Sequence, residues 1–63
     1  MYERDLLREE FDRVLRDKRK SAQMLAEMLS RVEDPALRSH ISDMHAHARR
    51  DVELGERLVE IVS

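Results

Sequence analysis

Two residues of opposite charge, Lys18 and Asp51, stand near the midpoints of two otherwise apolar stripes. On helices folded back against each other they would lie at nearly the same height. A charge on a core face is costly unless it is paired, so the pattern predicts an ion pair within a helical bundle. Such a pair serves either a polar site or the register of the helices, as in coiled coils. Alternatively, the aliphatic stem of Lys18 packs on the apolar face and its ammonium group reaches water.

A second polar group combines His40, His45 and His47 with Asp43 and Asp51. His40, Asp43 and His47 fall along one side of a helix, and His47 is four residues from both acids. An acid beside an imidazole orients a metal-binding histidine, but it is also an ordinary surface pair. One helix supplies too few ligands to close a site. A metal site would therefore use His40, Asp43, His47 and Asp51 across a dimer, which we keep as an alternative.

Catalysis has no support in these residues. The chain has no cysteine, which excludes disulfides and thiolate metal ligands. No serine has a convincing histidine–acid context, and no glycine-rich phosphate loop occurs. We expect no catalytic residue and no cofactor.

Two helices joined by a short turn must position these side chains. Apolar periodicity predicts one domain over residues 1–63, with helices over about 3–31 and 35–62 and a turn at 32–35. Within the turn, Asp34 suits the N-cap and Pro35 the first helical position. Pro35 also disfavours helical geometry at Asp34, which ends the first helix. So short a linker allows only antiparallel packing, in which residue numbers that sum to about 69 face each other.

The apolar face of the first helix is wide, about 160° against the roughly 100° of a surface helix. One neighbour cannot cover it, so we expect an all-α antiparallel hairpin that dimerises into a four-helix bundle. Gly55, inside the second helix, is expected to mark a close approach of Phe11 from the same or the other chain. The predicted core consists of Leu7, Phe11, Val14, Leu25, Leu29, Leu37, Ile41, Met44, Leu58 and Val62.

Composition limits the partners. The net charge is −2 with both signs interspersed, which argues against a nucleic-acid or membrane module. No apolar run approaches the roughly 20 residues of a membrane span, and the charged N-terminus is not a signal peptide. We expect a cytoplasmic protein, and the preference for arginine over lysine suggests a bacterial source.

The stretch from Leu25 to Leu58, with its Val32-Glu33-Asp34-Pro35-Ala36-Leu37-Arg38 turn, resembles one hairpin of a ferritin-like protein. The resemblance implies two hairpins around two metals, with a Glu from the first helix and Glu-x-x-His from the second. In this sequence the position of the first-helix Glu falls near Lys18. The Glu and His of the second helix fall on Ala48 and Asp51 or, one residue earlier, on His47 and Arg50. The resemblance therefore implies a bundle whose metal site has become a Lys–Asp pair.

The sequence thus predicts a non-catalytic, self-associating hairpin with a structural, adaptor or regulatory role. Two alternatives remain: a ferritin-like metal-binding protein with a site assembled across the dimer, and a hairpin that completes a bundle with another protein.

Overall fold

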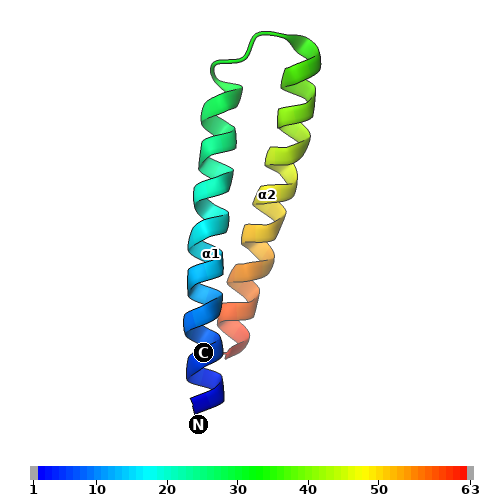
Figure 1. The fold of residues 1–63 in the computed structure, drawn as a ribbon. Helices are drawn as coiled ribbons and strands as arrows, with labels where there is room; N and C mark the ends of the chain where they lie inside the picture. Colours follow the sequence, from blue (N-terminus) through cyan, green and yellow to red (C-terminus); the bar gives the residue numbers. More distant parts are fainter. Residues whose placement is uncertain (1, 63) are drawn as a thin grey trace.

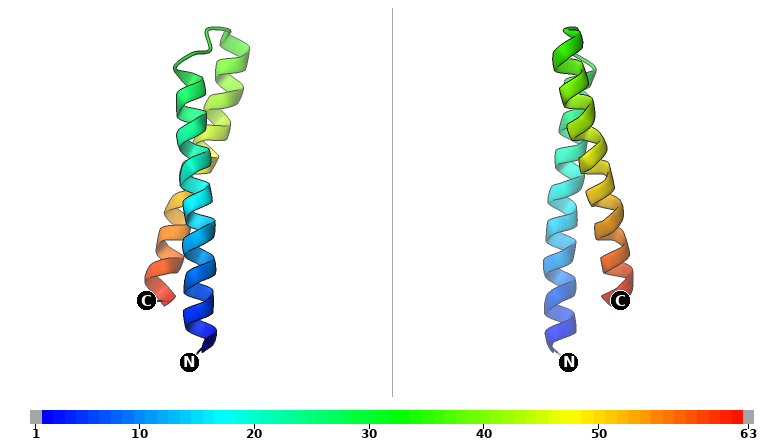
Figure 2. Two further views of the ribbon diagram at one scale, coloured as in Figure 1. Left: turned by 60° about the vertical axis from the view of Figure 1, so that its left-hand side comes forward. Right: turned by 90° about the vertical axis from the view of Figure 1, so that its right-hand side faces the viewer.

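The computed structural model describes residues 2–62 as two long helices packed against each other, α1 (Tyr2–Leu29) and α2 (Pro35–Val62) (Figure 1). The hairpin is 51 Å long and no more than 13 Å across in its backbone. Both ends of the chain lie opposite the turn. In the left view of Figure 2, α2 passes from one side of α1 near the turn to the other near the termini, so the helices wrap around each other. The predicted all-helical hairpin is confirmed.

The first helix ends at Leu29, two residues before the predicted boundary at 31. The N–H of Ser30 is shared between the carbonyls of Ala26 (3.3 Å) and Glu27 (3.2 Å), and the N–H of Arg31 donates to Met28 (3.0 Å). Bonds that span three residues tighten the last turn of a helix. The Ser30 hydroxyl also donates to the Glu27 carbonyl at 2.6 Å. Together these bonds end α1 before the proline is reached.

The start of α2 is capped by Asp34, as the sequence predicts. The Leu37 N–H donates to Asp34 Oδ1 at 3.0 Å, and the Arg38 N–H donates to the Asp34 carbonyl at 2.9 Å. The Arg38 guanidinium reaches back across the turn, where Nη1 donates to the carbonyls of Leu29 and Val32, the latter at 2.9 Å. A cation from α2 thus satisfies the free carbonyls at the end of α1 and fixes the turn.

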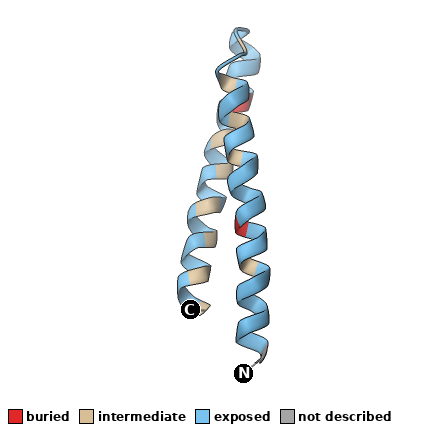
Figure 3. Ribbon diagram, turned by 90° about the vertical axis from the view of Figure 1, so that its left-hand side faces the viewer, coloured by how far each residue is buried: buried red, intermediate tan, exposed pale blue. Residues whose placement is uncertain are grey.

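A single seam joins the two helices. Its residues alternate at spacings of four and three, which is the heptad spacing of a coiled coil. Within residues 3–62, every buried or half-buried residue belongs to this seam, and Lys18 is the seam residue that stays exposed. The tan and red segments of Figure 3 follow it along the facing sides of the helices. The seam comprises Phe11, Leu15, Lys18, Ala22, Leu25, Leu29 and Val32, facing Ile41, His45, Ala48, Val52, Gly55, Val59 and Val62.

The hairpin alone buries only part of the predicted core. Leu15 and Ile41 are 5% and 8% exposed, and they are the apolar residues that count as buried in the described chain. Phe11, Leu25 and Leu29 are half-buried, as is Val62. The other predicted core residues are between 41% and 56% exposed in the single chain, because they lie beside the seam and not on it: Leu7, Val14, Leu37, Met44 and Leu58.

Gly55 does mark a close approach, but the neighbour is Leu15 where Phe11 was expected. A Cβ at Gly55 would lie 2.9 Å from Leu15 Cδ1. The two positions face each other across the seam, whereas Phe11 lies a turn further along α1. The missing side chain at Gly55 is what lets Leu15 become the most buried residue of α1.

We expect Asp34→Ala to lower the free energy of unfolding by about 1 kcal/mol, because it removes the N-cap acceptor of α2. Chemical denaturation followed by circular dichroism measures the change. Glu33→Ala is the matched control, since it removes an adjacent acid that caps nothing. Equal effects of the two substitutions would show that the cap does not stabilise the hairpin.

We expect Gly55→Leu to destabilise the protein by about 1–3 kcal/mol, because overpacking displaces Leu15 from the seam. In Gly55→Ala, a gain in helix propensity of about 1 kcal/mol offsets the shift of one methyl group, so its stability should stay near that of the parent. Ala46→Leu, at an exposed position of the same helix, controls for the added side chain. A Gly55→Leu variant as stable as the Ala46→Leu variant would contradict the contact.

Candidate interaction surface

The two sides of the seam differ in chemistry. Among the described residues, ten large apolar side chains stay exposed, and nine of them lie on one side of the hairpin. Six of the nine stand at heptad positions next to the seam, and Met24, Leu54 and Ile61 stand one position further out on the same side. The tenth, Leu6, points outward from α1. We call this side the apolar flank; it comprises Leu7, Val14, Met24 and Met28 of α1 and Leu37, Met44, Leu54, Leu58 and Ile61 of α2.

The opposite side of the seam is polar. Its positions next to the seam hold Asp5, Asp12 and Arg19 on α1, and Arg49 and Glu56 on α2. Arg19 Nη2 lies 3.1 Å from Glu56 Oε2, with both side chains about half exposed. These charged side chains are solvated by water, so leaving this side exposed carries no free-energy penalty. The contrast makes the apolar flank the candidate interaction surface of the hairpin.

The charged pair Lys18 and Asp51 lies in the middle of the apolar flank. Lys18 Nζ is 3.3 Å from Asp51 Oδ2, so the structure brings together the two residues that the sequence singles out. Each side chain is 47% exposed. A pair with this exposure contributes about 0–1 kcal/mol. If another chain covered the flank, both the desolvation cost of the pair and the attraction between its charges would rise.

A shallow hollow of about 180 Å³ opens on the apolar flank beside this pair, between the pair and the chain termini. Leu15 and Gly55 belong to the seam beneath it, and its remaining lining is apolar apart from the two charges. The lining residues are Phe11, Val14, Leu15, Lys18, Asp51, Leu54, Gly55 and Leu58.

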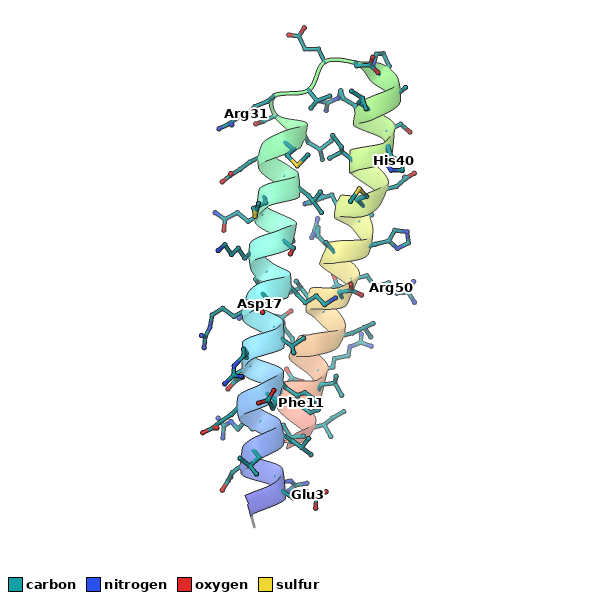
Figure 4. All side chains as sticks on the ribbon, viewed as in Figure 1. Glu3, Phe11, Asp17, Arg31, His40 and Arg50 are labelled. Atoms are coloured by element: carbon teal, nitrogen blue, oxygen red, sulfur yellow. The ribbon has the colours of Figure 1, made fainter. Side chains whose placement is uncertain are left out.

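The histidines do not converge on one another. His40, Asp43 and His47 are exposed on α2, and Figure 4 shows His40 near the turn, far from Phe11 at the other end of the hairpin. Within the described residues, no three histidine or acidic side chains come close enough together to hold a metal ion. The four-residue metal set would need a second chain and stays a prediction.

Sequence reasoning named His45 among the histidines but did not place it on the contact between the helices. It lies on the seam and is half-buried, four residues after Ile41 and three before Ala48. The alternation of four and three along α2 could have placed it there. A search for apolar residues passes over it, because a histidine occupies an otherwise apolar row.

Comparisons with protein-family models, curated proteins and solved structures find no match to this chain. Neither helix, over the described residues, has a stretch long and apolar enough to cross a membrane. The resemblance to a ferritin-like hairpin stays a prediction.

We expect Lys18→Met and Asp51→Leu each to destabilise the protein and the double variant to recover most of the loss. A double-mutant cycle by chemical denaturation measures the coupling. A half-exposed pair gives at most about 1 kcal/mol, whereas removing one partner of a covered pair costs about 3–5 kcal/mol. We predict coupling above the exposed value. Additive single effects would show that the two charges act independently.

Proposed function

We propose that this chain is a non-catalytic hairpin that associates with a second copy through its apolar flank, forming a four-helix bundle. The concentration of exposed apolar side chains on one flank carries this proposal. An apolar patch of this extent, next to a polar opposite side, is typical of an interaction site. The role of such a bundle is structural, adaptor or regulatory.

The small size of the buried core supports the need for a partner. Chains of this length seldom gain enough stability from their own core, and they commonly rely on disulfides, metals or oligomerisation. The sequence contains no cysteine. Self-association would add a second layer of apolar contacts along most of the 51 Å length of the hairpin.

A second copy fits the charges of the flank. The hollow of the flank is lined by one cation and one anion at the same height, Lys18 and Asp51. A surface with one charge of each sign complements a copy of itself, because a symmetric interface pairs residue i with j and j with i. Another protein would have to supply a matching acid and base, which the copy already has.

We expect the melting temperature of the isolated chain to rise with its concentration, because folding and association are linked. We also expect Leu58→Glu to weaken association at least tenfold, since a single buried, unpaired charge costs several kcal/mol. Circular dichroism melts and light scattering across a dilution series measure both effects.

Leu6→Glu is the matched control, because it makes the same substitution at an exposed leucine outside the apolar flank. Its association should match that of the parent. Met24→Glu, at the other end of the flank, repeats the test should Leu58→Glu unfold the hairpin. A folded monomer whose melting temperature ignores concentration would overturn the proposal. An unfolded monomer would instead indicate an obligate partner of another kind.

A further inference from the structure

We propose that the second copy docks with its turn at the same end of the bundle, so that α1 of each chain faces α2 of the other. The two Lys18–Asp51 pairs then form one alternating ring of four charges at mid-height. This inference rests on the self-association proposed above and adds the orientation of the partner.

Symmetry leaves two arrangements for two elongated flanks placed face to face. If the two-fold axis runs along the helices, both turns lie at one end and α1 faces the partner's α2. If the axis runs across the helices, the turns lie at opposite ends and α1 faces the partner's α1. Both arrangements bury the same flank, so apolar area does not distinguish them.

The charges distinguish the two arrangements. Lys18 and Asp51 lie at one height, since their side chains meet at 3.3 Å. With the axis along the helices, Lys18 lies opposite the partner's Asp51, and Asp51 lies opposite the partner's Lys18. Each charge then has an opposite charge on both sides.

With the axis across the helices, like charges face each other. The pair lies close to the middle of the hairpin, so full overlap of the flanks would bring Lys18 near the partner's Lys18. Juxtaposed like charges cost several kcal/mol at an interface. In a covered, less polar environment that repulsion is stronger than in water.

One packing feature favours the arrangement with the turns at opposite ends, but it is weaker than the effect of the charges. Met24, Met28 and Met44 line the turn half of the flank, and with opposed turns they would fill the partner's hollow of about 180 Å³. Methionine adapts its shape to irregular gaps at small cost. A charge cannot adapt in this way, so we expect the charges to set the orientation.

Distances between spin labels test the orientation. The chain has no cysteine, so Glu33→Cys places a single label in the exposed turn of each copy. With both turns at one end, the labels lie less than half the 51 Å hairpin length apart. With turns opposed, their separation approaches the full length. Pulsed electron paramagnetic resonance separates these values.

Lys20→Cys on the outer surface near mid-height is the control, because either dimer gives a measurable label distance there. A short Glu33→Cys distance supports the proposal. A long distance overturns the orientation and leaves self-association intact. Absence of coupling at both positions, with a monomer mass, overturns self-association itself.

Charge variants give an independent test. Lys18→Glu makes the ring all negative and Asp51→Lys makes it all positive, so each variant alone should dimerise at least about tenfold more weakly. An equimolar mixture should restore association as a heterodimer. Parent-like dimers of either single variant would contradict the ring.

Discussion

One seam is all that two helices can share, and this limit governs the whole molecule. A heptad places two residues in every seven on the seam, so the remaining apolar residues are left to solvent. Here Leu15 and Ile41 are the apolar residues that become buried in the described chain. The tight turn, capped by Asp34 and tied by Arg38, holds the two rows in register. The turn adds little buried surface, so any further layer of contacts would have to come from outside the chain.

The pair of Lys18 and Asp51 links the fold to the proposed assembly. Within the hairpin it joins the two helices at a common height, although at 47% exposure it adds little stability. In the proposed dimer, the same two charges would select among partners. Polar residues inside coiled coils act similarly, giving up stability to specify register and orientation. In the proposed dimer, the two charged residues on this apolar surface would therefore determine the orientation of the second copy.

Sequence reasoning predicted the antiparallel hairpin, the Asp34 cap and the residues that meet at mid-height. It treated the seam and the apolar flank of α1 as one wide apolar face. The reason is that a straight helical wheel drifts by about 20° per heptad relative to helices that wrap around each other. Over α1 this drift mixes the seam with residues beside it, such as Val14, and gives the wide apolar face. The same averaging assigned Phe11 to the notch at Gly55, which Leu15 occupies. Sequence reasoning also left His45 off the seam, where the structure places it.

The central claim is that the apolar flank is covered by a second copy of the chain. Sedimentation equilibrium of the untagged protein at micromolar concentration, with helicity measured on the same samples, tests it most directly. We expect a helical species with twice the 7.5 kDa mass of one chain, which dissociates and loses helicity together on dilution. A fully helical species of single-chain mass at every concentration would contradict it, because the hairpin would then be stable with its flank exposed to water.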